Sequence, residues 1–345
     1  MLTTTPAYAP YPLETDATSL GFVETVLYGG LGPASAAGAG PGHVASASAA
    51  GAGLGPVASA SAAGAGRAVK IVARHRPERT SNRATIFLHG AAGSWTTWTP
   101  MLAAAEEAGI TIVNPVLFDL PGWGDATPEP SAAPLTLEVI CELVKDMALE
   151  LGYTEWDIVG HSLGGFIALH MASIWPQSVQ SVALVSGTTW SVIESVAHPW
   201  RGLRIIPGFV LLRFFMRLLA PVQPVALAAV RGLRAVGVLR LASFPLFRHL
   251  SKIDESVVRA LATELRPRSF VTAGDVTRGY DADAQWALIE CQVHATKGDD
   301  DVFVTDEDLE RLERVVRRAT TTVIADCGHF GNVEQPAATL AALEF

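Results

Sequence analysis

The chain has 345 residues, of which 49% are hydrophobic and 17% charged, and a formal net charge of −9. This length and composition can bury the core of one α/β domain with an insertion, and the negative charge argues against a general nucleic-acid-binding protein. Three cysteines without a CxxC pair or a cysteine–histidine cluster predict neither a disulfide framework nor a zinc site.

The N-terminal twenty residues contain no basic residue and no apolar run, so they do not look like a secretory signal. We also find no uninterrupted apolar stretch of the ~18 residues that a membrane span needs. The expectation is therefore a soluble, cytoplasmic protein.

An antiparallel pair of strands is predicted at the start of the chain. Residues 19–29 alternate between apolar and polar side chains, and residues 67–75 have the composition of a partner strand. Between them, residues 31–66 form a Gly/Ala/Ser tract with two near copies, at 43–53 and 56–66. Such a tract cannot bury enough apolar surface to offset its ordering entropy, so we interpret it as a disordered loop inside a hairpin.

From residue 84 onward, short apolar runs alternate with helical stretches, which indicates a parallel sheet covered on both faces. The predicted strands are 84–89, 111–119, 156–161, 181–187, 289–298 and 320–326. The predicted helices are 97–108, 135–151, 163–175, 305–318 and 333–344. With the first two strands, this gives a mostly parallel eight-stranded sheet flanked by helices.

One long segment interrupts this alternation. Residues 188–285 separate two strands by more chain than one crossover helix needs, and the strand–helix pattern then resumes. We expect an α/β core domain formed by residues 1–187 and 286–345, with residues 188–285 as an inserted helical cap.

The sequence Gly160-His161-Ser162-Leu163-Gly164 stands between an apolar strand and a helix. A G-x-S-x-G in this context predicts a sharp strand-to-helix turn that exposes a nucleophilic serine at the carboxyl edge of the sheet. The N–H of Leu163, directly after the serine, is then a candidate donor to an oxyanion.

The motif GHSLGG in this setting resembles the capped, serine-dependent branch of the α/β-hydrolase superfamily. The likeness covers residues 84–345 apart from the detailed cap sequence. The segment from His89 to Trp95 resembles the family's HG-x-x-G loop, which implies the Ala91 N–H as the second oxyanion donor. The turn that begins at Asp119 resembles a D-x-P-G-x-G loop, and we interpret His89 and Asp119 as loop-bracing.

The base and the acid follow in chain order. His329 comes after an apolar strand and a glycine, which places it at the same sheet edge as Ser162. Three adjacent carboxylates, Asp299, Asp300 and Asp301, follow the preceding predicted strand. The resemblance selects Asp301 as the residue that orients His329, and Asp299 and Asp300 remain alternatives.

These residues predict a Ser-His-Asp triad that hydrolyses a carboxylic ester of a hydrophobic small molecule, with no metal or organic cofactor. Serine rather than aspartate at position 162 disfavours the dehalogenase and epoxide-hydrolase variants of the fold. The alternatives are a carbon–carbon bond hydrolase or lactonase of the same fold and, in another class, a non-catalytic ligand-binding protein.

The cap sequence is unusually basic. Residues 195–253 contain eight arginines and one lysine but no aspartate or glutamate, a local charge of +9 within a chain of −9. We consider three interpretations: a helical lid whose arginines lie at the surface above an apolar underside, a lid that contacts anionic membrane or lipid, and a surface for a protein partner.

Overall fold

The computed structural model describes residues 8, 10–30, 44–45, 68–126 and 135–344. The Gly/Ala/Ser tract predicted as a disordered loop therefore lies outside the described residues, apart from Val44 and Ala45.

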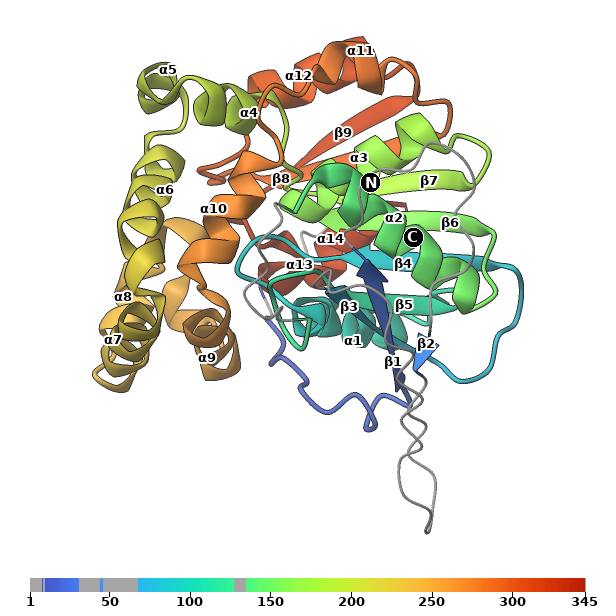
Figure 1. Cartoon of the computed structure of the whole chain (residues 1–345), viewed down its shortest axis with the longest axis horizontal. Coiled ribbons are helices and arrows are strands. Elements are labelled where there is room, and N and C mark those ends of the chain that lie inside the picture. The colour runs from blue at the N-terminus through green and yellow to red at the C-terminus, as the bar shows by residue number, and fades with distance from the viewer. Residues whose placement is uncertain (1–7, 9, 31–43, 46–67, 127–134, 345) are drawn as a thin grey trace.

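In the described part of the chain, nine strands form a single sheet (Figure 1). Their order across the sheet is β2 (Val44–Ala45), β1 (Val23–Gly30), β3 (Ala68–His75), β5 (Pro115–Asp119), β4 (Arg83–Leu88), β6 (Glu155–His161), β7 (Val179–Val185), β8 (Gln292–Gly298) and β9 (Ala319–Ile324). The eight predicted strands are all present, and the two-residue β2 adds a ninth at the edge. The strands from β5 to β9 pair in parallel, whereas β1 and β3 form the predicted antiparallel pair.

Four strands begin later than predicted, and the two largest differences, at β1 and β5, have local reasons. The first begins at Val23 because the residues before it form a turn, in which the N–H of Gly21 donates to the carbonyl of Thr18. The strand predicted from residue 111 begins at Pro115, directly after Asn114, whose φ of 42° is incompatible with extended backbone.

The buried strand residues alternate between two hydrophobic clusters, one on each face of the sheet. Ile86 and Leu88 point to one face, and Phe87 points to the other. The first face is covered by α2 (Leu137–Glu150), α3 (Leu163–Ile174) and α12 (Asp306–Val315), and the second by α1 (Thr99–Glu107) and α14 (Pro336–Ala342). The helices flank the sheet on both sides, as predicted.

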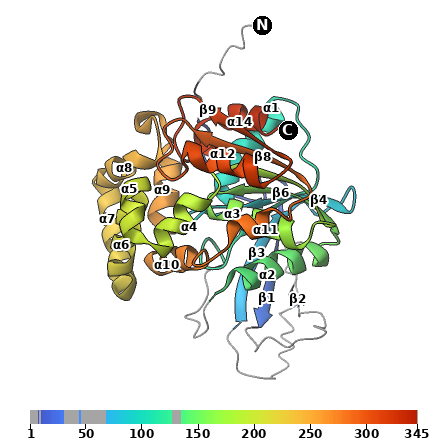
Figure 2. The ribbon, with the colours of Figure 1, turned by 90° about the horizontal axis from the view of Figure 1, so that it is seen from above.

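The segment between β7 and β8 is helical. It contains α4 (Trp190–Ala197), α5 (Pro199–Ile205), α6 (Pro207–Leu219), α7 (Gln223–Ala235), α8 (Val238–Ala242), α9 (Glu255–Glu264), α10 (Pro267–Asp275) and α11 (Ala282–Trp286). We call residues 190–286 the inserted helices. Figures 1 and 2 show α5, α6, α7 and α8 farthest from the sheet, with α9 and α10 between them and the core.

Candidate active site

The nucleophile candidate, Ser162, lies between β6 and α3 with φ 49° and ψ −116°, a conformation that non-glycine residues rarely adopt. The crossing of β6 and α3 is tight around it. A Cβ atom on Gly164 would come within 1.9 Å of the Leu88 carbonyl oxygen, and one on Gly160 within 2.4 Å of the Gly164 oxygen. At both positions the neighbouring backbone leaves no space for a Cβ atom, so only glycine fits. This close packing holds Ser162 at the end of the strand.

His329 and Asp301 form a buried pair. The Nδ1 atom of His329 lies 3.0 Å and 3.1 Å from the two carboxylate oxygens of Asp301. The Asp301 side chain is fully buried, and its Oδ1 also accepts the N–H groups of Phe303 and Val304. Burial alone would raise the pKa of Asp301. The charge of His329, the hydrogen bond from His329 and the hydrogen bond from the Phe303 N–H together lower this pKa below its usual range.

This arrangement fixes the proton on the imidazole. An ionised carboxylate only accepts hydrogen bonds, so Nδ1 of His329 carries the proton and Nε2 keeps its lone pair. Nε2 is then free to accept a proton from another group.

Asp301, rather than its two neighbours, contacts His329. Asp299 accepts the N–H groups of Asp326 and Cys327, and Asp300 is half-exposed in an ion pair with Arg248. Neither side chain reaches the imidazole, so the structure brings together the residue that the resemblance selected.

The two candidate oxyanion donors border the same cavity as Ser162. Among the residues that the structure describes, the N–H groups of Ala91 and Leu163 have no hydrogen-bond acceptor. Gly90 allows this loop to lie against the serine, because a Cβ atom there would come within 2.8 Å of the Ser162 Cβ. Unengaged N–H groups on residues that line the cavity of Ser162 are candidate donors to a developing oxyanion.

His89 and Asp119 hold the loop from His89 to Trp95 in place, as predicted for both. His89 Nε2 accepts the N–H of Leu120, which leaves Nδ1–H to donate to the Gly90 carbonyl. Asp119 is fully buried and accepts hydrogen bonds from the Trp95 N–H and the Arg74 guanidinium. These contacts tie the loop to two other parts of the core.

Three groups around His329 were not predicted from the sequence. His161, which follows β6, donates from Nε2 to the His329 carbonyl oxygen at 3.1 Å. Burial and the nearby His329 ring hold the pKa of His161 well below its ordinary range, so it stays neutral. The carbonyl of Leu246, from the inserted helices, accepts the His329 N–H at 3.0 Å. The only sequence signal for a role of His161 was its position directly before the predicted nucleophile Ser162.

The third group is Glu334, a fully buried carboxyl group behind the His329 loop. Its two oxygens accept the N–H groups of Gly328 and Arg248 and the hydroxyl of Tyr8. Burial, the largest influence, raises the pKa of Glu334 to about 7. Glu334 therefore joins the loop of the base to the inserted helices and to the N-terminal segment.

A cavity of about 80 Å³ lies between the sheet edge and the inserted helices. Its lining contains four polar side chains, Ser162, Thr188, Thr277 and His329, and the rest of the lining is apolar. The lining from the inserted helices includes Val192, Phe209, Leu212, Leu246, Leu261, Leu265 and Phe270, and that from the core includes Ala91, Leu163, Phe303 and Phe330. No hydrogen bond joins Ser162 to His329 among the described residues.

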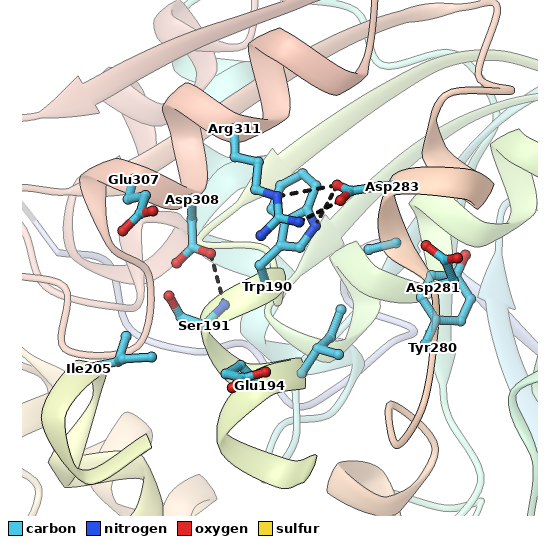
Figure 3. Close-up of a pocket in the computed structure, with 12 residues that line it drawn as sticks. Trp190, Ser191, Glu194, Ile205, Tyr280, Asp281, Asp283, Glu307, Asp308 and Arg311 are labelled. Carbon is cyan, nitrogen blue, oxygen red and sulfur yellow. Dashed lines mark hydrogen bonds and ion pairs between the residues drawn. The ribbon is translucent and has the colours of Figure 1, made fainter. Parts of the chain in front are cut away.

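A larger hollow of about 310 Å³ lies elsewhere and contains none of the predicted site residues. Figure 3 shows its lining, in which the Arg311 guanidinium lies over the Trp190 ring and pairs with Asp283. The N–H of Ser191 donates to Asp308 nearby. These contacts join α4, α11 and α12, and the residues that line the hollow include no histidine and no cysteine.

Residues 85–343 match the model of the alpha/beta hydrolase family. Since this match covers most of the chain and includes every candidate site residue, the chain belongs to the alpha/beta hydrolase family.

Individual relatives match over shorter regions. The chain is 30% identical over 112 residues to bifunctional epoxide hydrolase 2 of Sus scrofa, which is 32% of this chain and 20% of that protein. It is 25% identical over 126 residues to 2-hydroxy-6-oxononadienedioate/2-hydroxy-6-oxononatrienedioate hydrolase 1 of Pseudomonas putida, 36% of this chain and 43% of that one. The matched regions thus span less than half the length of these curated relatives.

Among solved structures, the enol-lactonase from Burkholderia xenovorans LB400 is similar with a TM-score of 0.60 and 16% sequence identity. The similarity covers 80% of this chain and 95% of that one. At this level of identity the similarity shows the shared fold alone.

Proposed function

We propose that the protein is a serine hydrolase that cleaves a carboxylic ester of a hydrophobic substrate through an acyl-enzyme on Ser162. The observation that carries the proposal is the His329–Asp301 pair beside Ser162 at one apolar cavity. An alcohol at a strained turn, a base with a fixed tautomer and a buried acid are the components that acyl transfer requires.

In the first half of the reaction, Nε2 of His329 takes the proton of the Ser162 hydroxyl while the oxygen attacks the ester carbonyl carbon. The carbonyl oxygen becomes an oxyanion, to which the N–H groups of Ala91 and Leu163 donate. The ionised Asp301 stabilises the imidazolium that forms. When the intermediate collapses, the carbon–oxygen bond to the leaving alcohol breaks and His329 returns the proton to that alcohol.

In the second half, a water molecule replaces the alcohol. His329 takes one proton from water as its oxygen attacks the acyl carbon, and the same N–H groups stabilise the second oxyanion. Collapse breaks the bond to Ser162 and returns the proton to the serine oxygen. The net reaction adds one water to one ester and gives an acid and an alcohol.

The proposal requires that Ser162 and His329 form a hydrogen bond during the reaction, although none links them in this structure. Such bonds in unliganded enzymes often shorten only when substrate binds. The lining of the cavity supports an apolar acyl group, because leucine and phenylalanine side chains surround the space next to Ser162.

Hydrolysis of a panel of soluble substrates tests the proposal. We expect p-nitrophenyl acyl esters to be hydrolysed with a higher kcat/KM than lactones or dienoic keto-acids, and Ser162→Ala to abolish all turnover above background. A wild-type protein that is folded but leaves every ester intact would refute the ester assignment.

A carbon–carbon bond hydrolase or lactonase is a second candidate, because the names of the Pseudomonas and Burkholderia relatives describe such reactions. Such an enzyme would use the same residues on a carbon–carbon bond or on a cyclic ester. In the panel above, a preference for a lactone or a dienoic keto-acid over the p-nitrophenyl esters would select it. A folded protein without turnover of any substrate would instead favour a non-catalytic binding protein.

A further inference from the structure

The outermost of the inserted helices expose apolar side chains to solvent. From Pro207 to Ala235 the chain is a 29-residue helical stretch with mean hydropathy 1.5, of which only 17% is buried in its most apolar window. It is long and apolar enough to cross a membrane by length and composition, although four arginines interrupt its apolar sequence: Arg213, Arg217, Arg231 and Arg234.

Helix α6 is apolar on two faces. Its inner face carries Phe209 and Leu212, which line the cavity next to Ser162. Its outer face carries four exposed residues at positions i, i+3, i+4 and i+7, the spacing of one side of a helix. We call the following exposed residues the outer stripe: Leu211, Phe214, Phe215, Leu218, Val222 and Val225.

The outer stripe is unusual for a surface in water. Soluble monomers rarely expose contiguous apolar patches of large side chains unless the patch contacts a partner or a membrane. On the neighbouring helix α5, the indole of Trp200 is 85% exposed. Figures 1 and 2 show α5, α6 and α7 along the same outer side of the molecule.

Positive charge accompanies this apolar surface. Residues 195–253 carry +9 and the remainder of the chain carries −18, so the charge is strongly separated along the sequence. In the structure, acids from outside this segment pair with five of its arginines: Arg201, Arg213, Arg234, Arg240 and Arg248. Arg217 and Arg231 are exposed, lie 14 residues apart along the helical stretch and form no ion pair with any described residue. Exposed apolar side chains next to unpaired arginines are complementary to an anionic lipid surface.

The helix is built to lie on a surface rather than to span it. Its inner face is fixed to the protein, where the buried Arg213 guanidinium donates to Asp275 at 2.6 Å and Met216 packs in the core of the inserted helices. Crossing a bilayer would break this packing and place Arg213 and Arg217 in hydrocarbon, at high cost.

We propose that the outer face of α5–α8 docks on an anionic lipid bilayer, with the outer stripe at the boundary between headgroups and acyl chains. A second copy of this chain is a poor occupant, because a symmetric contact would bring the Arg217 and Arg231 charges of the two copies together. A further consequence, which rests on the proposed function, is that the ester substrate is taken from the lipid phase, since α6 separates that phase from Ser162.

Co-sedimentation with vesicles tests the docking surface, using phosphatidylcholine alone and phosphatidylcholine mixed with phosphatidylglycerol. The full-length protein should bind the anionic vesicles and not the neutral ones. The paired substitutions Phe214→Ser with Phe215→Ser, and Arg217→Glu with Arg231→Glu, should each reduce the partition coefficient by about tenfold or more.

Matched controls carry the same chemical changes outside the inserted helices. Leu149→Ser with Val323→Ser removes two exposed apolar side chains, and Arg76→Glu with Arg317→Glu reverses two exposed charges. Both controls should bind as the wild type does. Equal binding to neutral and anionic vesicles, no binding by the wild type, or equal losses in variants and controls would overturn the docking surface. A dimer that the phenylalanine substitutions dissociate, without vesicle binding, would also overturn it.

Hydrolysis of a soluble p-nitrophenyl ester separates this inference from the proposed function. None of the substituted residues lines the cavity, so all variants should keep wild-type kcat/KM on that ester. The stripe and arginine variants should lose activity only on an ester embedded in anionic vesicles. Vesicle binding without any esterase activity would contradict the proposed function and leave the docking surface standing.

Discussion

At the scale of single residues, the Asp301 carboxylate determines which nitrogen of His329 can act as a base. Both carboxylate oxygens face Nδ1, and the N–H groups of Phe303 and Val304 hold the carboxylate in position. The neutral, buried His161 fixes the same loop from the other side through the His329 carbonyl. The reactivity of the imidazole is thus set by several buried hydrogen bonds.

Asp301→Asn tests this control of the tautomer. The amide group would donate toward Nδ1, so the imidazole would carry its proton on Nε2 and could not accept the serine proton. We expect kcat/KM on a soluble ester to fall by about 10⁴-fold, as for the loss of the orienting acid in other triads. Asp300→Asn is the matched control, because that side chain pairs with Arg248 outside the cavity. An equal effect of both substitutions would contradict the assignment.

Glu334 gives a second residue-scale prediction, concerning pH. Its pKa is raised from 4.5 to about 7, so between these values the folded protein holds a proton that the unfolded chain releases. The contribution of Glu334 to the free energy of unfolding is therefore fully present below pH 4.5, and it is lost as the pH rises to about 7.

Glu334→Gln should remove this part of the pH dependence. Urea unfolding at about pH 4.5 and about pH 7 measures the free energy of unfolding for both proteins. The wild type should lose on the order of 1–3 kcal/mol more than the variant across this interval. Parallel losses in the two proteins would show that Glu334 ionises as it does in the unfolded chain.

At the scale of elements, the strand–turn–helix from β6 to α3 positions the nucleophile through backbone contact. The helix starts directly after Ser162, and its first turn lies against the end of β4 near the Leu88 carbonyl. A side chain at Gly164 has no space, so this crossing depends on the glycine.

Gly164→Ala should therefore destabilise the protein strongly, by about 3 kcal/mol or more, because the new methyl group would overlap the Leu88 carbonyl. Gly232→Ala is the matched control within a helix, since a Cβ atom there meets nothing within 4 Å. That change should raise the free energy of unfolding by about 0.5–1 kcal/mol. Equal urea midpoints for the two variants would contradict this account of the turn.

The sequence predicted these elements well where the pattern is local. The apolar runs located all eight main strands, and the motif around Ser162 located the turn. Strand starts were less predictable, because the turn at Gly21 and the left-handed Asn114 depend on hydrogen bonding and backbone conformation rather than on apolar periodicity. Asp301 could be chosen over its neighbours only by resemblance, since three adjacent carboxylates look alike in sequence.

At the scale of the whole molecule, the inserted helices complete the site that the core begins. Leu246 accepts the His329 N–H, and the Arg248 N–H donates to Glu334 behind the same loop. Neither contact could be predicted from the sequence, because each joins distant parts of the chain through a backbone atom, and backbone atoms leave no pattern in the sequence. The basic composition of the segment was evident from the sequence, whereas the two apolar faces of α6 emerged only from its packing.

Two neighbouring leucines on α6 test how the inserted helices shape the cavity. Leu212 lines it, and Leu211 belongs to the outer stripe. Leu212→Ala should enlarge the cavity and shift the preferred p-nitrophenyl ester toward longer acyl chains, with a loss of stability of about 2 kcal/mol. Leu211→Ala should leave the chain-length profile unchanged. Identical profiles for both variants would show that acyl chains bind elsewhere.

Covalent labelling by a fluorophosphonate, followed by mass spectrometry of the digested protein, tests the central claim most directly. The reagent phosphonylates only an activated serine, so the adduct should lie on Ser162, and His329→Ala should slow its formation by several orders of magnitude. A folded protein that hydrolyses esters but carries the label on another serine, or on none, would contradict the account.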